Sequence, residues 1–165
     1  MSDVQTSPLD EVLGHRDLIV NDFQIMIATV NGSGSQTANT TILRSIFRMG
    51  VPVAGKNIFP SNIQGLPTWF TVRVNKNGYI ARHEDYQVLV AMNKETILDD
   101  VEKLASGGIC LYPQEWNLKH DRDDITYYEM PVKELIDNAD VPKNLTSYVQ
   151  NMVYVGVLAT LIEID

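Results

Sequence analysis

The chain has 165 residues, 44% of them apolar, and a net charge of −8, which together indicate one globular domain with an ordinary core. The excess of acidic side chains argues against general binding to nucleic acid or to an anionic membrane surface. No apolar run approaches the roughly 18 residues that would span a membrane, and residues 1–22 lack the features of a secretory signal.

The first third of the chain reads as an arm followed by a strand–turn–helix unit. Residues 1–22 are polar and form an N-terminal arm, and the domain proper is expected over residues 23–165. The Ile- and Val-rich segment 23–30 predicts a buried strand. The turn at 31–36 then leads into a helix over 37–49, whose apolar residues recur at helical spacing.

The middle of the chain predicts strands with one antiparallel connection. A short strand at 51–55 is followed by a Pro- and Gly-containing loop at 56–67, and residues 68–74 alternate as a strand does. Asn77-Gly78 is a strong hairpin signal and predicts a returning strand at 79–81. Another buried strand is expected at 87–92.

The last third predicts a further alternation of helices and strands. The final helix is apolar nearly all round, so we expect it to be buried in this domain or against a neighbour. The whole order predicts an α/β, Rossmann-like sandwich with a mostly parallel sheet plus an antiparallel hairpin. The elements expected are helices at 95–104, 132–138 and 146–164, strands at 109–112 and 125–130, a turn at 106–108 and a loop at 114–124.

The turn Asn31-Gly32-Ser33-Gly34-Ser35-Gln36 is the leading candidate for a binding site. Its small residues let the backbone approach a ligand closely, and the following helix presents free N–H groups to a phosphate. The match to the dinucleotide fingerprint G-x-G-x-x-G is partial, because Thr37 stands at the third glycine and no acidic residue follows the next strand. Binding of phosphate or coenzyme, binding of NAD, docking to a partner and a ligand-free turn all remain open.

Other reactive side chains point to structural roles. Cys110 is the only cysteine, so an intrachain disulfide and a cysteine-held metal or iron–sulfur cluster are excluded, and a cytoplasmic location is expected. It lies inside a predicted strand, so we expect a buried and unreactive thiol. The run His83-Glu84-Asp85 is typical of a solvated loop, and His120 has no metal-ligand spacing around it.

Five segments, in this order, resemble the gamma domain of the 2-oxoacid:ferredoxin oxidoreductases. Gly32, Gly34 and Gln36 match a turn of the type G-x-G-G-Q-G, and Ile63 and Gly65 match a later Ile-Arg-Gly-Gly loop in which Gln64 replaces the arginine. The other matching segments are 85–93, 107–109 and 151–159, and the resemblance covers residues 23–165.

This resemblance implies a domain without catalytic residues in an enzyme of the 2-oxoglutarate type, which oxidatively decarboxylates a 2-oxoacid to an acyl-coenzyme A. Thiamine diphosphate, magnesium and iron–sulfur clusters would be held by partner alpha and beta domains, which pass electrons to ferredoxin. No cofactor is expected on this chain alone, apart from a contribution to the coenzyme A site. The residues that this implies are Gly32, Ser33, Gly34, Ser35 and Gln36, with Lys56, Asn62 and Gln64 as further contacts.

Two functions of other classes compete with this reading. A stand-alone NAD(P)-binding oxidoreductase with a Rossmann-like fold would need a ribose-binding acid after the second strand. A ligand-free interaction module would show no pocket at residues 32–36 and a large apolar surface patch.

Overall fold

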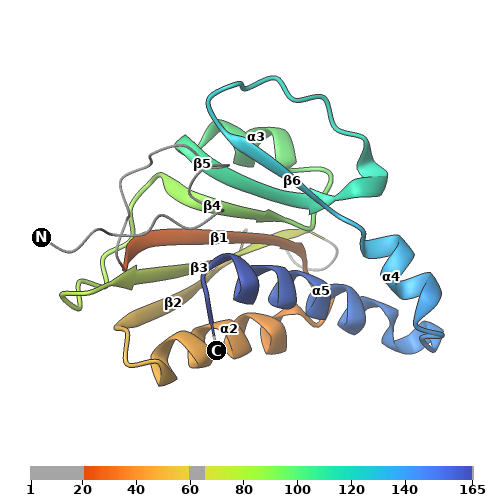
Figure 1. The fold of residues 1–165 in the computed structure, drawn as a ribbon, viewed down its shortest axis with the longest axis horizontal. Helices are drawn as coiled ribbons and strands as arrows, with labels where there is room; N and C mark the ends of the chain where they lie inside the picture. Colours follow the sequence, from red (N-terminus) through yellow and green to blue (C-terminus); the bar gives the residue numbers. More distant parts are fainter. Residues whose placement is uncertain (1–20, 60–65, 165) are drawn as a thin grey trace, which may run out of the picture.

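A six-stranded sheet forms the centre of the molecule in the computed structural model, which describes residues 21–59 and 66–164 (Figure 1). The strand order is β2-β3-β1-β4-β5-β6. Strand β3 is antiparallel to both of its neighbours, and the pairs β1–β4, β4–β5 and β5–β6 are parallel. The strands are β1 (Asp22–Val30), β2 (Val53–Ile58), β3 (Pro67–Asn75), β4 (Tyr86–Ala91), β5 (Leu104–Pro113) and β6 (Thr126–Met130).

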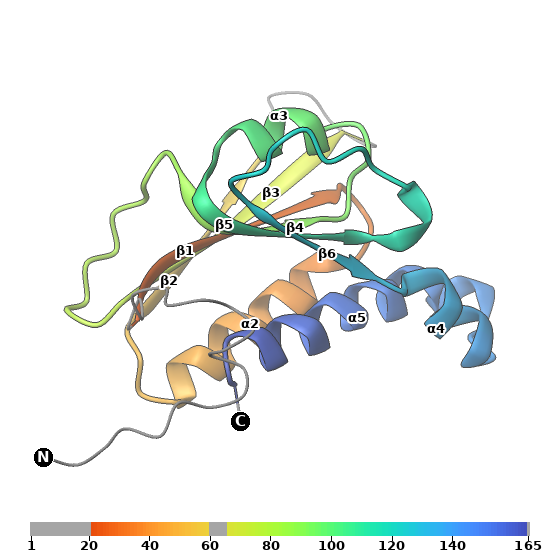
Figure 2. The ribbon, with the colours of Figure 1, turned by 45° about the horizontal axis from the view of Figure 1, so that its top comes forward.

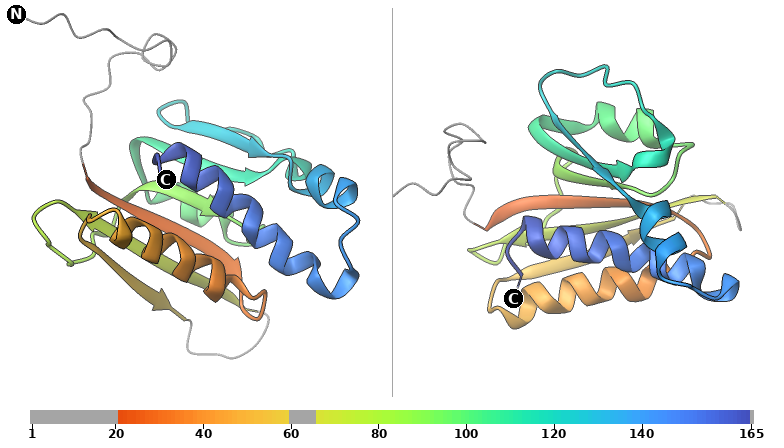
Figure 3. Two further views of the ribbon diagram at one scale, coloured as in Figure 1. Left: turned by 60° about the horizontal axis from the view of Figure 1, so that its bottom comes forward. Right: turned by 45° about the vertical axis from the view of Figure 1, so that its right-hand side comes forward.

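Helices cover both faces of this sheet. Helices α2 and α5 lie side by side on one face, and α3 lies on the other (Figures 2 and 3). The described residues contain no helix long and apolar enough to cross a membrane. The helices are α2 (Ser35–Arg48), α3 (Ile97–Glu102), α4 (Val132–Asn138) and α5 (Thr146–Leu161), and two short 3-10 turns are η1 (Gln114–Trp116) and η2 (Lys143–Leu145).

Two apolar cores lie on the two faces of the sheet, as alternation along the strands requires. The larger core joins residues of β1, β3 and β4 such as Ile27 and Val72 to Ile42 of α2 and Leu158 of α5. The smaller core packs β4 and β5 against α3. Trp69 and Phe70 are neighbours on β3 and point to opposite faces of the sheet. Each aromatic ring therefore packs against one of the two cores.

The predicted α/β architecture with a mostly parallel sheet and an antiparallel element is confirmed, whereas several boundaries are wrong. Helix α2 begins at Ser35 rather than Thr37, and α3 is shorter than the predicted 95–104. Strand β2 continues to Ile58, so Lys56 lies in a strand and not in a loop. The turn predicted at 106–108 lies within β5, where Gly107 adopts a positive φ of 76°.

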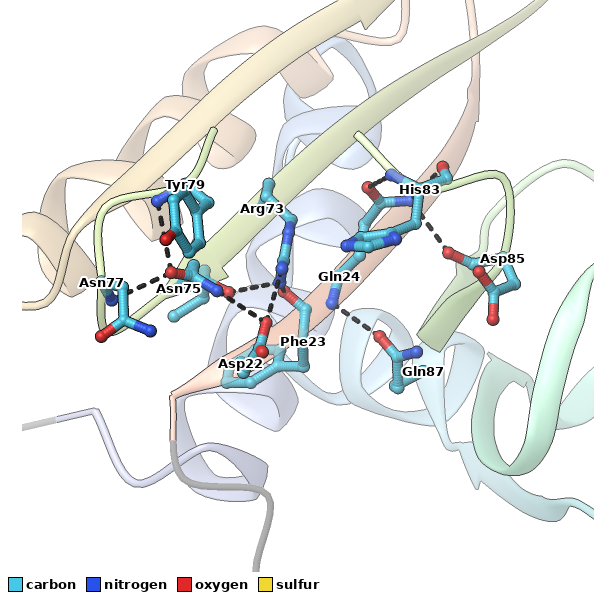
Figure 4. A network of polar contacts seen from close by, with 11 residues as sticks. Asp22, Phe23, Gln24, Arg73, Asn75, Asn77, Tyr79, His83, Asp85 and Gln87 are labelled. Carbon is cyan, nitrogen blue, oxygen red and sulfur yellow. Dashed lines mark hydrogen bonds and ion pairs between the residues drawn. The ribbon is translucent and has the colours of Figure 1, made fainter. Parts of the chain in front are cut away.

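The largest departure concerns the strand expected at 79–81, which does not form. The turn at Asn77-Gly78 is present, but β3 pairs with β1 and β2 instead of with the chain that follows it. Side chains from β1 and β3 hold this returning segment (Figure 4). Gln24, which is fully buried, accepts a hydrogen bond from His83 N and donates to the carbonyls of His83 and Asp85.

The same network contains an ion pair at the start of β1. Arg73, only 6% exposed, donates to the Asp22 carboxylate and to the carbonyls of Phe23 and Val74. The hydrogen bonds from Arg73 and Asn75 lower the pKa of Asp22. The amides of Gln24 and Asn75 therefore do for residues 76–85 what backbone pairing does in a hairpin, whereas Arg73 holds the start of β1 against β3.

Candidate functional site

The glycine-rich turn lies at the carboxyl end of β1, where α2 begins. Gly34 is the residue before the helix, and its φ of 77° is a left-handed conformation that glycine adopts without strain. Ser33 N donates to Val30 O, and Asn31 N donates to Leu66 O, so the turn is bonded to the end of β1 and to the residue before β3. The turn therefore has one defined backbone path.

Helix α2 presents its first N–H groups without a protein cap. No side chain caps its N-terminus in the described part of the chain, and its first turn carries no acidic residue. The unpaired N–H groups and the helix dipole make such an end attractive to oxygen acceptors and anions. The turn thus provides a donor-rich edge.

A cavity of about 330 Å³ opens beside this turn and reaches the ends of β2 and β3. None of its lining residues is charged, and the sequence that supplies them is uncharged over 23–43 and over 57–72. Aromatic rings form part of the wall, and amide side chains, hydroxyl side chains and glycines form the rest. The lining residues are Thr29, Asn31, Gly32, Gly34, Ser35, Gln36, Asn39, Asn57, Phe59, Thr68, Trp69 and Phe70.

The structure brings only part of the sequence-based candidate set together. Gly32, Gly34, Ser35 and Gln36 line the cavity. The buried Ser33 hydroxyl has no hydrogen-bond partner among the described residues and does not line the cavity. Asn62 and Gln64 lie outside the described residues.

Lys56 and its neighbour Asn57 point to opposite sides of β2, because side chains alternate along a strand. Asn57 lines the cavity on the α2 side, which places exposed Lys56 over the other face of the sheet. The structure therefore puts an amide where the sequence suggested an ammonium group.

Helix α5 holds the turn from one side. Asn151 Nδ2 donates to Ser33 O at 2.9 Å, and Tyr154 donates its hydroxyl to Asn39 Oδ1 at 2.9 Å. The Tyr148 ring lies directly over Gly34, since a Cβ built on that glycine would be 2.6 Å from Tyr148 Cε1. The conformation of the turn therefore depends on a helix more than 100 residues further along the chain.

Sequence reasoning missed Asn39 and Asn57 as cavity residues. Asn39 follows the turn on the buried side of α2, at a position where a core helix normally carries an apolar residue. A buried amide on an apolar face is a usable signal, because buried polar groups are normally hydrogen-bonded. Asn57 gave no such signal, since the end of β2 was not predicted.

A second, larger cavity of about 600 Å³ lies on the α3 face of the sheet. Its floor includes Met26, Ile58 and Trp69, and its rim is formed by the loop 82–85 and by α3. His83, Glu84 and Asp85 lie in this rim, in an exposed loop as the sequence predicts. Trp69 lines both cavities and donates its indole N–H to Asp100 Oδ1 at 2.9 Å.

Asp100 is an isolated buried carboxyl group beside this second cavity. It is 3% exposed, and desolvation raises its pKa, although hydrogen bonding from Thr96 and Trp69 opposes that shift. The Thr96 hydroxyl is near this carboxyl, but neither Thr96 Oγ1 nor Asp100 Oδ2 makes a hydrogen bond of normal geometry among the described residues. The ionised form of Asp100 is therefore poorly compensated.

We expect Asp100→Asn to change the pH dependence of stability. The raised pKa means that Asp100 binds a proton more tightly in the folded chain than in the unfolded chain, so its contribution to stability falls as the pH rises above about 4. Asparagine keeps an acceptor for Trp69 and removes this loss. Denaturant unfolding at pH 4 and pH 7 should show that the variant gains stability relative to the wild type as the pH rises. An unchanged difference would contradict this account, and Asp99→Asn, an exposed position on the same helix, is the matched control.

A polar cluster at the edge of the sheet includes His120, which lies in the segment predicted as a loop. The fully buried Tyr112 donates its hydroxyl to Glu129 at 2.8 Å and lies 2.9 Å from His120 Nε2. The His120 ring stacks on Tyr127 with centroids 4.0 Å apart. These contacts attach the segment 114–124 to β5 and β6.

Cys110 is fully buried in β5, and burial raises the pKa of its thiol to about 12. The thiolate is the reactive form of cysteine, so this residue is an inert core thiol. Among the described residues, no three His, Cys, Asp or Glu side chains are grouped so as to hold a metal ion.

Comparison with known proteins identifies one protein family. The family model described as pyruvate ferredoxin/flavodoxin oxidoreductase matches residues 24–165. No curated protein sequence matches this chain.

Solved structures share the fold at low sequence identity. A 2-oxoglutarate:ferredoxin oxidoreductase from Magnetococcus marinus, solved with 2-oxoglutarate, coenzyme A and succinyl-CoA bound, matches with a TM-score of 0.74 and 23% identity over 88% of this chain and 25% of that chain. The gamma subunit of a keto/oxoacid ferredoxin oxidoreductase from Geobacter sulfurreducens matches with a TM-score of 0.67 and 14% identity over 86% of this chain and 78% of that one.

A third structure, the pyruvate oxidoreductase subunit PORC from Thermotoga maritima, matches with a TM-score of 0.50 and 16% identity over 81% of this chain and 94% of that chain. The present chain thus spans about a quarter of the Magnetococcus protein but most of the two separate subunits.

Proposed function

The chain belongs to the pyruvate ferredoxin/flavodoxin oxidoreductase family, and we propose that it is the gamma domain of a 2-oxoacid:ferredoxin oxidoreductase, of the 2-oxoglutarate type. The complete enzyme would oxidatively decarboxylate a 2-oxoacid, form an acyl-coenzyme A and transfer electrons to ferredoxin. This chain would serve as a scaffold and form one wall of the coenzyme A site.

The redox chemistry belongs in partner domains. Iron–sulfur clusters are commonly held by four cysteine thiolates, whereas this chain has one cysteine, buried within β5. No residue set for a thiamine diphosphate–magnesium site is apparent in the sequence either. We therefore assign no catalytic residue to this chain and place the thiamine and iron–sulfur cofactors in the partner domains.

The observation that carries the coenzyme A proposal is the donor-rich cavity at the turn 31–36. Coenzyme A carries phosphate oxygens and amide carbonyls, which are hydrogen-bond acceptors. The open N-terminus of α2 fits such acceptors, and the absence of charge in the lining fits the neutral part of the molecule. A coenzyme A molecule is present in the Magnetococcus structure, which shares this fold.

The NAD(P) alternative is not favoured. In the dinucleotide fold an acidic residue at the end of the second strand contacts the ribose beside the glycine-rich turn. Here β3 separates β2 from β1, and the residues around the end of β2 are Asn57, Ile58 and Phe59. A ligand-free interaction module is also less well supported, because a cavity opens at the turn.

Helix α5 offers a surface for the partner domains. Leu145, Tyr148 and Met152 are between 44% and 53% exposed and follow one side of the helix. No charged residue occurs in the sequence over 145–162, so this surface is uncharged. Tyr148 belongs to it and also packs on Gly34, which brings a partner-covered surface to the edge of the coenzyme cavity.

Calorimetric titration tests the coenzyme site. The full chain, alone and co-expressed with thiamine-binding subunits, is titrated with coenzyme A and separately with NAD. We expect coenzyme A binding that Gly34→Asp abolishes and Gly78→Asp leaves intact, because both glycines have φ near +80° but only Gly34 lines the cavity. Binding of NAD instead, or no coenzyme A binding in either preparation, would contradict the proposal.

A further inference from the structure

Asn39 lies at the point where α2, α5 and the cavity meet. Its side chain is 2% exposed, it lines the cavity, and it lies on the buried side of α2 one turn after Ser35. Its only hydrogen bond among the described residues runs from the Tyr154 hydroxyl to Oδ1. The amide nitrogen, Nδ2, has no partner in the described part of the chain.

The Tyr154 hydroxyl determines which way this amide faces. Tyr154 is fully buried on α5, and burial raises the pKa of its hydroxyl, which therefore stays protonated. A buried O–H without an acceptor is unfavourable, and the one hydrogen bond that the Tyr154 hydroxyl makes among the described residues goes to Asn39 Oδ1. The hydroxyl must donate, so the amide oxygen faces Tyr154 and the two N–H groups face away from it.

We propose that Asn39 is a binding residue of this cavity, with Nδ2 donating to an oxygen acceptor of the ligand, and that Tyr154 is the positioning residue that fixes the amide in this orientation. This inference rests on the proposed coenzyme A site. The acceptor is an amide carbonyl or a phosphate oxygen of the coenzyme.

The other polar groups of the cavity agree with an acceptor ligand. Thr29 Oγ1 and Ser35 Oγ are 3.0 Å apart, and one of these hydroxyls donates to the other. A hydroxyl pair has two protons and uses only one in that bond, which leaves one donor for the cavity. Together with the N–H groups of α2, the cavity offers mainly donors on the Asn39 side.

Asn39→Asp is the sharpest test, because aspartate has the same shape and still accepts the Tyr154 hydrogen bond but has no N–H to donate. We expect the affinity for coenzyme A to fall at least tenfold while the variant stays folded, as judged by its unfolding midpoint. Tyr154→Phe should weaken coenzyme A binding about fivefold by releasing the amide, which corresponds to roughly 1 kcal/mol, the usual contribution of one hydrogen bond.

The double variant separates positioning from a general structural effect. In the Asn39→Asp background no amide remains to be oriented, so Tyr154→Phe should cause no further loss of coenzyme A affinity. Independent losses that add in the double variant would overturn the positioning role of Tyr154. Thr160→Val, which removes an exposed hydroxyl from the same helix away from the cavity, is the control and should bind normally.

Three ligands identify the acceptor. Pantetheine carries amide carbonyls without phosphate, and inorganic phosphate represents the other source, beside coenzyme A itself. Weaker binding of pantetheine to Asn39→Asp assigns the amide carbonyl, and weaker binding of phosphate alone assigns the phosphate oxygen. Wild-type-like coenzyme A affinity of a folded Asn39→Asp variant would overturn this inference and leave the proposed function intact, whereas no coenzyme A binding by the wild type would overturn both.

Discussion

Gly34→Ala should lower the free energy of unfolding by about 2–3 kcal/mol, through backbone strain and overpacking together. Alanine at a φ of 77° is strained, and its Cβ would be 2.6 Å from Tyr148 Cε1. The ring can move only by leaving its place over the turn. Chemical denaturation followed by circular dichroism measures this loss.

Two variants separate the strain from the contact. Gly78→Ala has the same strain at a φ of 79° but meets no atom within 4 Å, so it should cost about 1–2 kcal/mol. Tyr148→Ala should reduce the extra cost of Gly34→Ala when the two are combined. Equal losses at Gly34 and Gly78 would show that Tyr148 does not rest on the turn.

Leu158→Ala should lower the free energy of unfolding of the isolated chain about as much as Gly34→Ala does, whereas Met152→Ala should change it little. Leu158 is fully buried between α5 and the sheet, and such a truncation costs about 2–5 kcal/mol. Met152 is 44% exposed, so its truncation should change the unfolding free energy of the isolated chain by about 0.5 kcal/mol or less. The same denaturation experiment compares both variants.

Association with the partner subunits should be sensitive to substitution of Met152, although the stability of the isolated chain is not. If those subunits cover the exposed side of α5, Met152→Asp should weaken the assembly, measured by analytical ultracentrifugation of the co-expressed subunits, without unfolding this chain. An assembly that tolerates Met152→Asp would place the partner surface elsewhere. Asn138→Asp, at an exposed position on α4, adds the same single negative charge and is the control.

The elements that the sequence predicted well are those whose signals are local. The apolar periodicity of 37–49 and of 146–164, and the buried runs at 23–30 and 87–92, correspond to α2, α5, β1 and β4. The helix predicted at 132–138 has the same bounds as α4. Hydrophobic spacing alone predicts such elements, because α2 and α5 pack an apolar side against the sheet and β1 and β4 are buried on both of its faces.

The order of the strands in the sheet could not be predicted from local sequence patterns. The Asn77-Gly78 turn predicts a hairpin, but β1 and β2 already occupy both edges of β3, so the chain after the turn has no strand to pair with. Gln24 instead bonds to the backbone of that segment. A buried glutamine within an apolar strand is visible in the sequence, but its partner 59 residues away is not.

The sequence predicted the glycine-rich turn of the candidate site but not the helix residues that pack around it. The turn residues were found because glycine and small polar residues between a strand and a helix form a recognisable local pattern. Asn39, Asn151 and Tyr154 belong to two helices that meet only in the folded chain. The choice of Lys56 followed from expecting a loop at 56–67, whereas strand alternation points it to the face opposite the cavity.

The most direct test of the proposed function is an assay of the assembly purified through this chain from co-expression with thiamine-binding subunits. We predict reduction of ferredoxin that requires both a 2-oxoacid, with 2-oxoglutarate the first to be tested, and coenzyme A, and that is lost in the Asn39→Asp assembly at limiting coenzyme A. Ferredoxin reduction that needs no coenzyme A, or reduction of NAD by this chain alone, would contradict the assignment of the chain as a gamma domain with a wall of the coenzyme A site.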